Sequence, residues 1–227
     1  TCALPILFSA TDGGIFRTDN PDSYIGRTEA AICDPGYSAV RFDDLNHGFG
    51  ITQFYHGAPY PDGAGYLGGT QDNGTILGLD QWGRDDWISV SGGDGGYVAI
   101  DPQNTNNLFV ESQRFGFKRS TNGGYNFEFA LNGITEERQD FLFITPFVMD
   151  PNNSARLWAG GRRLWRTDNR ATSWSAASTV NLGSAQISAI AVAPGNSDFV
   201  VVGTTDGFVY RNDAALDAGS NTVWQFS

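Results

Sequence analysis

Residues 117–127 read FKRSTNGGYNF, and this stretch decides the fold. A short strand leads into Ser120 and Asn122, whose polar side chains can fold onto the amides of a turn. Gly124 can adopt a positive φ, and Phe127 then begins the return strand and packs beneath the turn. The stretch therefore predicts a β-hairpin corner.

The beginning of this phrase recurs along the chain, each time with an arginine before a small polar or turn residue. The four copies begin at Phe16, Lys118, Trp165 and Tyr210. The last three arginines, Arg119, Arg166 and Arg211, are 47 and 45 residues apart. Four-stranded propeller blades repeat with a period of about 40–50 residues. The spacing therefore predicts a β-propeller.

The composition supports an all-β chain with an acidic surface. Among 227 residues there are 29 Gly, 16 Phe, 8 Tyr and 6 Trp, in short alternating runs broken by turn dipeptides. The formal net charge is −11 with no basic run, which argues against nucleic acid or an anionic membrane as a partner. No apolar run is long enough to cross a membrane, so we expect no membrane span.

Both ends of the chain suggest a fragment. Residues 1–6, TCALPI, match one reading frame of a common sequencing-library adapter, and we expect them to be a sequencing scar. Without Cys2, only Cys33 remains, which predicts no intrachain disulfide. The chain stops inside a strand-like run at residues 222–226. We therefore expect that a signal peptide and further blades belong to a longer protein.

Strand and turn signals divide residues 7–227 into about five blades of one partial propeller. A blade can bury its hydrophobic faces only against neighbouring blades, so the repeats should stack around an axis. Five blades are too few to close a propeller of this kind, which predicts an incomplete part of a larger one. The blades are expected at residues 7–46, 47–90, 91–133, 140–178 and 183–227.

The hairpin phrase also carries a family resemblance. Residues 120–127 are a variant of the Asp-box, S-x-D-x-G-x-x-W, and residues 167–174 are a more degenerate copy. The structural positions of the two copies are Ser120, Asn122, Gly124, Phe127, Thr167, Asn169 and Trp174. On these phrases the chain resembles the BNR/Asp-box β-propellers.

Within that family the chain looks closest to the group of sortilin-type ligand-binding domains and xyloglucan-degrading glycoside hydrolases. GGTQDNGT at 68–75 and GGDGGYVAIDPQN at 92–104 are similar to segments of bacterial secreted members. The resemblance implies an extracellular or periplasmic location. It does not fix the function, because one propeller fold hosts many functions.

The connections of such a propeller fall on two faces. The turn face holds the first-to-second and third-to-fourth strand connections, with the Asp-boxes. The loop face holds the second-to-third connections and the links between blades, where sites are usually built.

Three arginines fall in loop-face turns that do not require arginine: Arg114, Arg162 and Arg163. Their guanidinium forks can bind carboxylate or sulfate groups. Gln71 and Asp72 belong to the same face, although Asp and Asn before Gly are also ordinary hairpin chemistry.

Three aromatic residues are expected near the loop face. Tyr55, Trp82 and Phe115 are either stacking platforms for sugar rings or packing between blades. His47 and His56 lack a spaced set of Cys, His or Glu partners, so we predict no metal. No nucleotide-binding phrase is present, and we predict no cofactor.

Three functions remain, in order of preference. The first is a module that binds a glycan or protein ligand on the loop face. The second is a glycoside hydrolase, which needs two carboxyl groups. The xyloglucan-degrading family carries a catalytic Asp in a phrase that residues 11–17, TDGGIFR, resemble with one residue fewer, so Asp12 is a candidate and Asp94 its local partner. The third is an assembly factor resembling the propeller used in photosystem II biogenesis. Whether the chain is an enzyme stays open.

Overall fold

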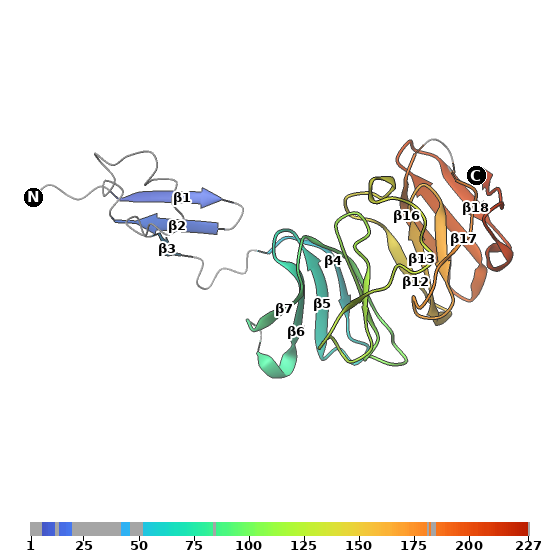
Figure 1. Cartoon of the computed structure of the whole chain (residues 1–227). Helices are drawn as coiled ribbons and strands as arrows, with labels where there is room; N and C mark the ends of the chain where they lie inside the picture. The colour runs from blue at the N-terminus through green and yellow to red at the C-terminus, as the bar shows by residue number, and fades with distance from the viewer. Residues whose placement is uncertain are drawn as a thin grey trace, which may run out of the picture. The chain divides into compact units, whose positions relative to one another are not determined.

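The chain divides into two compact units, Thr1–Ile51 and Thr52–Ser227, and each is described by itself. Figure 1 shows a computed structural model of the chain. The described residues are 6–11, 14–19, 42–45, 52–83, 85–180, 182 and 185–226.

The first unit contains a three-stranded antiparallel sheet. Its strands are β1 (Leu7–Thr11), β2 (Gly14–Thr18) and β3 (Asp43–Asp44), in that order across the sheet. Asp12 and His47 lie outside the described residues.

The second unit consists of four antiparallel sheets of four strands each, and the strands of every sheet follow chain order. The first two sheets are formed by β4 (Phe54–Pro59), β5 (Gly65–Thr70), β6 (Gly74–Leu79) and β7 (Trp87–Ser91), and by β8 (Gly95–Ile100), β9 (Leu108–Ser112), β10 (Lys118–Ser120) and β11 (Glu128–Phe129). The other two are formed by β12 (Phe147–Asp150), β13 (Asn153–Gly160), β14 (Leu164–Thr167) and β15 (Ser175–Ala176), and by β16 (Ile187–Ala193), β17 (Asn196–Thr204), β18 (Val209–Asn212) and β19 (Gln225–Phe226).

The four sheets pack in succession through their first strands. Strand β8 packs against β4 and β5 and contacts β12, and β16 packs against β12 and β13. First strands that meet in this way form the inner edge of radially arranged blades. The predicted all-β propeller of four-stranded antiparallel blades is therefore confirmed.

Helical structure is sparse. The described residues contain three single-turn 3₁₀ helices, η2 (Asp80–Trp82), η3 (Arg138–Asp140) and η4 (Ala215–Asp217). No helix in the described part of the chain is long and apolar enough to cross a membrane.

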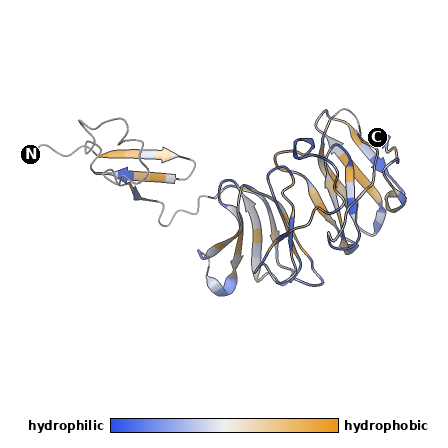
Figure 2. Ribbon diagram, in the orientation of Figure 1, coloured by the Kyte–Doolittle hydropathy of each residue, from blue (hydrophilic) through white to orange (hydrophobic). Residues whose placement is uncertain are grey.

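A separate hydrophobic core fills the space between each pair of neighbouring sheets of the second unit. Strand β13 contributes to two of them, because successive side chains of a strand point to opposite faces. Leu157 and Ala159 join the core shared with the β8–β11 sheet, and Trp158 joins the core shared with the β16–β19 sheet. Hydrophobic residues accordingly concentrate on the strands and polar ones on the connections (Figure 2).

The hairpin corner predicted at residues 117–127 forms as expected. Ser120 Oγ accepts a hydrogen bond from the Gly124 amide at 3.0 Å, and Asn122 Oδ1 accepts one from the Asn126 amide at 3.1 Å. Gly124 has φ +91°. Phe127 packs against the core between the β4–β7 and β8–β11 sheets.

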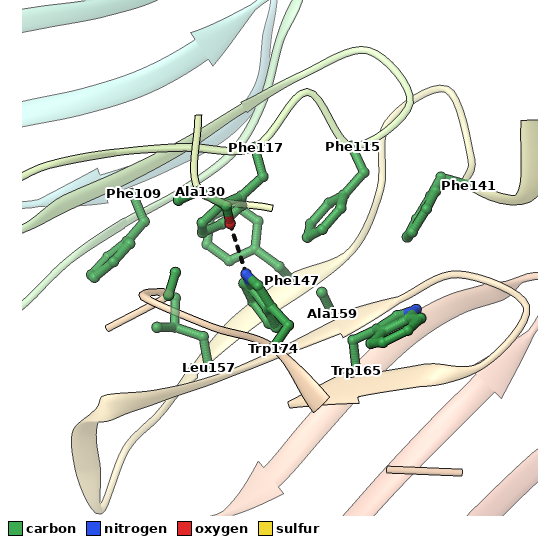
Figure 3. Close-up of a cluster of buried hydrophobic side chains, with 11 residues drawn as sticks. Phe109, Phe115, Phe117, Ala130, Phe141, Phe147, Leu157, Ala159, Trp165 and Trp174 are labelled. Carbon is green, nitrogen blue, oxygen red and sulfur yellow. Dashed lines mark hydrogen bonds between the residues drawn. The ribbon is translucent and has the colours of Figure 1, made fainter. Parts of the chain in front are cut away.

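The degenerate copy in the β12–β15 sheet has the same geometry. Thr167 Oγ1 accepts a hydrogen bond from the Ala171 amide at 3.1 Å, and Asn169 Oδ1 accepts one from the Ser173 amide at 3.0 Å. Ala171 has φ +57°, where the other copy has glycine. Trp174 extends into the core and donates its indole N–H to the Ala130 carbonyl at 2.8 Å (Figure 3).

Two of the repeated arginines, Arg119 and Arg166, tie their corner to the next sheet. Arg119 donates to the Arg170 carbonyl at 3.0 Å and to Thr172 Oγ1 at 2.7 Å. One sheet further on, Arg166 donates to the Ala215 carbonyl at 2.8 Å. Arg119 and Arg166 are therefore scaffold residues, and candidate site residues are side chains that break the repetition.

Candidate functional site

Charged side chains gather on the loop face where the β8–β11 and β12–β15 sheets meet. They come from the β9–β10 hairpin, the link around η3 and the β13–β14 hairpin. We call this set the arginine patch: Arg114, Glu136, Arg138, Asp140, Arg162 and Arg163. It holds four of the chain's fourteen Lys and Arg residues, although the whole chain carries a net charge of −11.

Arg114 occupies a strained position at the tip of the β9–β10 hairpin. Arg114 and Phe115 both have φ +56°, a conformation that hairpins normally assign to Asn or Gly. The Phe115 ring is 2% exposed in the core, so Phe115 is packing between blades and not a sugar platform. The Arg114 amide donates to the Phe143 carbonyl at 2.9 Å. Its guanidinium is exposed, and no described residue pairs with it.

Two other arginines of the patch are held by neighbours. Arg162 forms an ion pair with Asp140 at 3.1 Å, and its side chain is 48% exposed. Arg138 Nη2 donates to the Gln113 carbonyl at 3.1 Å. Because both contacts leave part of each guanidinium fork unused, the patch can still bind an anionic group.

Glu136 is the half-buried acid at the centre of this set. It accepts hydrogen bonds from Trp165 Nε1 at 2.6 Å and from the Arg163 amide at 3.1 Å. Burial raises the pKa of Glu136, and the Asp140 carboxylate raises it further, against the opposing effects of the Trp165 hydrogen bond and the Arg163 charge. A side chain at Gly161 would collide with the Glu136 carboxylate.

Arg163 lies beside Glu136 with its guanidinium over the Trp165 ring, 5.6 Å from the ring centroid. Its Nε is buried and has no hydrogen-bond partner among the described residues. An unpartnered guanidinium nitrogen is costly unless something else pairs with it. Arg163 therefore lies next to an acid and still has one buried N–H without a hydrogen-bond acceptor among the described residues.

The carboxylate of Asp94 already accepts a hydrogen bond from a neighbouring hairpin. Asp94 Oδ1 accepts a hydrogen bond from the Asp72 amide at 2.9 Å, and Asp94 forms an isolated β-bridge with Gly74. Asp72 has φ +62° at the tip of the β5–β6 hairpin, and the Gln71 amide donates to the Gln53 carbonyl at 2.9 Å. Asp12 falls outside the described residues, so the Asp12–Asp94 pair stays a prediction.

The two remaining aromatic candidates lie apart. Tyr55, 38% exposed, lies near the start of β4, next to the β5–β6 hairpin and thus near the loop face. Trp82 belongs to η2, between the third and fourth strands of its sheet, and this places it on the turn face. The structure does not bring Trp82 together with the arginines.

Sequence reasoning passed over part of the arginine patch. Residues 136–140, EERQD, form a charged run in the link between two predicted blades, on the face where sites were expected. That run was a usable signal for Glu136, Arg138 and Asp140. No group of three or more metal-ligating side chains occurs among the described residues.

Glu111 was also missed, and it breaks the repeat. The equivalent positions at the end of the second strand in the other three sheets of the second unit are Gly69, Gly160 and Gly203. Glu111 is 1% exposed. This interruption of a glycine position was visible in the sequence.

The Glu111 carboxylate is only half satisfied. Oε1 accepts hydrogen bonds from the Tyr97 amide at 3.2 Å and the Thr145 amide at 2.9 Å, which joins two sheets. Oε2 is buried without a partner among the described residues. Burial raises the pKa of Glu111 well above its ordinary value. His56, stacked on Tyr97 at 4.7 Å between ring centroids, has a pKa lowered by burial.

Comparisons with known proteins give the fold and not the family. No protein-family model matches the chain, and no curated protein is similar to it in sequence. The chain is similar in structure to an ancestral GH74 enzyme, with a TM-score of 0.56 and 18% identity over 76% of this chain and 24% of that one. It is also similar to the GH74 xyloglucanase from Xanthomonas campestris, with a TM-score of 0.54 and 17% identity over 78% of this chain and 30% of that one.

A third solved structure, that of U3-55K, has a TM-score of 0.51 and 12% identity, covering 72% of this chain and 49% of that one. At such identities the likeness establishes the propeller fold alone. The chain spans about a quarter to a third of the length of the two GH74 structures.

Proposed function

We propose that this chain is part of a secreted or surface Asp-box β-propeller that binds an acidic glycan, one bearing carboxylate or sulfate groups, through the arginine patch. The hydrogen-bonded corners at Ser120 and Thr167 support the Asp-box assignment. The similarity to GH74 enzymes, one of them a xyloglucanase, supports a glycan as the ligand.

One observation carries the proposal: Arg114 is exposed, strained and unpaired within the described part of the chain. A non-glycine residue at φ +56° costs about 1 kcal/mol or more, and such strain concentrates at ligand-binding positions. A turn of Asn and Gly would connect the same strands without this cost.

The surrounding charges favour an anionic ligand. Arg162, Arg138 and Arg163 present further N–H groups on the same face, and guanidinium binds carboxylate or sulfate in a bidentate fashion. The rest of the chain is strongly acidic, so a local cationic patch directs an anionic chain to this face.

The test is affinity electrophoresis of the full chain in gels containing polygalacturonate, dextran sulfate or neutral dextran. Retardation is expected in one or both anionic polymers, to weaken with added salt, and to fall at least about tenfold in affinity with Arg114→Ala or Arg162→Ala. Arg211→Ala is the matched control, because Arg211 is an exposed arginine on β18 outside the patch. Equal retardation of all variants, or none in any gel, would contradict the proposal.

Hydrolysis of a glycan is a second candidate, favoured by Glu136. A carboxyl group whose pKa is raised by burial and by a neighbouring carboxylate is suited to act as a general acid, with the second carboxylate, here Asp140, as its partner. Asp94 serves this role less well, because one of its oxygens anchors a turn.

Hydrolysis is tested by release of reducing ends from the same polymers and from xyloglucan. Glu136→Gln removes the acid and keeps one acceptor oxygen, which can serve the Trp165 indole, while the Arg163 amide loses its acceptor. Activity should therefore vanish, and a urea unfolding curve checks that the variant stays folded. The variants Asp12→Asn and Asp94→Asn test the catalytic pair that the sequence predicts. Absence of release from the folded chain, together with retardation in anionic gels, would leave binding as the function.

A further inference from the structure

A groove opens on the turn face between the β4–β7 and β8–β11 sheets, on the opposite face to the arginine patch. Its volume is about 480 Å³, within the range of ordinary ligand sites. One wall comes from the β4–β5 turn, η2 and β7, and the other from the β8–β9 turn and the corner after β10. Its lining is Tyr60, Leu77, Leu79, Trp82, Ile88, Ser89, Val90, Thr105, Asn106, Gly123, Gly124 and Tyr125.

Three aromatic rings dominate this groove. Tyr60 and Trp82 are half buried and pack against the core beneath, so their rings are held in place. Tyr125 is 95% exposed, and no ring contact or hydrogen bond to it occurs among the described residues. An exposed aromatic ring that lines the same groove as two fixed ones is a ready surface for stacking.

Hydrogen-bonding groups lie between the rings. The side chains of Ser89, Thr105 and Asn106 have no hydrogen-bond partner among the described residues. They offer both donors and acceptors. Gly123 and Gly124, with φ +72° and +91°, leave the floor of the groove free of side chains.

The groove differs from the arginine patch in the charge of its lining. None of its lining side chains is Asp, Glu, Lys, Arg or His. Acids surround the groove. Burial raises the pKa of Tyr60 and the Asp62 charge raises it further, and Asp85 and Asp86 line an adjoining hollow beside Trp82. This surrounding charge disfavours carboxylate or sulfate groups.

We propose that this groove binds a neutral oligosaccharide, with Tyr125, Trp82 and Tyr60 stacking on the apolar faces of sugar rings and Asn106, Thr105 and Ser89 bonding their hydroxyls. Flat β-linked sugar chains suit such a groove, because their rings present apolar C–H faces to aromatic platforms and hydroxyls at the edges. The site is distinct from the loop-face site and does not depend on it.

The experiment is isothermal titration of the full chain with cellohexaose, mannohexaose and xylohexaose. Binding of at least one hexaose is expected, with affinity falling about tenfold in Tyr125→Ala and further in Trp82→Ala. Phe129→Ala is the matched control, because Phe129 is a 70% exposed aromatic of β11 outside the groove. Since Tyr125 is exposed, its removal should leave the unfolding midpoint unchanged.

Two further arms separate this site from other interpretations. Arg114→Ala should leave hexaose binding intact, so failure of the loop-face proposal and failure of this one are distinguishable. Decaproline probes the alternative that the aromatic groove takes a polyproline segment. Binding of decaproline at Tyr125 in place of any hexaose, no hexaose binding, or hexaose binding unaffected by Tyr125→Ala would overturn the proposal.

Discussion

The carboxylate of Asp94 accepts a hydrogen bond from the main-chain amide of Asp72, 22 residues earlier in the chain, at 2.9 Å. The bond ties the link after β7 to the β5–β6 hairpin, which carries Asp72 at φ +62°. Asp94 therefore has a structural task whether or not it also touches a ligand.

Asp94→Ala should lower the free energy of unfolding by about 1 kcal/mol, because the Asp72 amide loses its acceptor. Asp94→Asn should be nearly neutral, since the amide oxygen can accept the same bond. Urea unfolding of both variants checks this. If Asp94→Asn keeps full stability and yet abolishes reducing-end release, Asp94 is a catalyst as well as an anchor; equal stability of Asp94→Ala and wild type would remove the structural role.

The contribution of Glu111 to the free energy of unfolding should be larger in mild acid than at neutral pH. Its pKa is higher in the folded than in the unfolded chain, so the folded state binds the proton more tightly. The stabilising effect of that proton is complete below the unfolded pKa of about 4.3 and is lost as the pH rises through the folded pKa. Burial lowers the pKa of the nearby His56, which stacks on Tyr97.

Glu111→Gln is accordingly expected to flatten the dependence of unfolding free energy on pH between about 4.5 and 8, and to raise stability at pH 8 by about 1–3 kcal/mol. Urea titrations at several pH values measure it, with Glu128→Gln as control, because Glu128 is an exposed residue of β11. A Glu111→Gln variant that retains the wild-type slope would contradict the burial argument.

Trp174→Phe should destabilise the protein by about 1–3 kcal/mol. The phenyl ring keeps most of the buried area and loses the indole bond to Ala130, which leaves a buried carbonyl unpaired. Thermal unfolding followed by circular dichroism gives the change. Phe129→Leu, at an exposed position, is expected to have little effect, and a similar loss in both variants would argue against a special role for the indole bond.

Arg114→Asn should stabilise the protein and weaken its binding to anionic polymers. Asparagine tolerates φ +56° better than arginine, so the unfolding free energy should rise by up to about 1 kcal/mol. Retardation in anionic gels should be lost in the same variant. A stabilised variant that still binds would mean that Arg114 is not the anchor of the acidic ligand.

The two Asp-box corners could be predicted from the sequence, whereas the arginine patch could not. Ser120 and Thr167 satisfy turn amides two to four residues away, so their geometry depends on local chemistry and is legible in sequence. The arginine patch depends on residues from 114 to 163 that meet only when two sheets pack. The turn sequences therefore predicted Arg114 and Arg162 as exposed cations. They gave no reason to expect Glu136 in the same site.

By itself, the sequence determined the all-β propeller, because turn chemistry and a 45–47-residue repeat are encoded within each blade. Only the tertiary structure decided that the Asp94 carboxylate is bound to Asp72, that Trp82 faces away from the arginines, and that Glu111 is buried. Those facts follow from which faces the sheets present to one another, and such packing between distant segments leaves no local pattern.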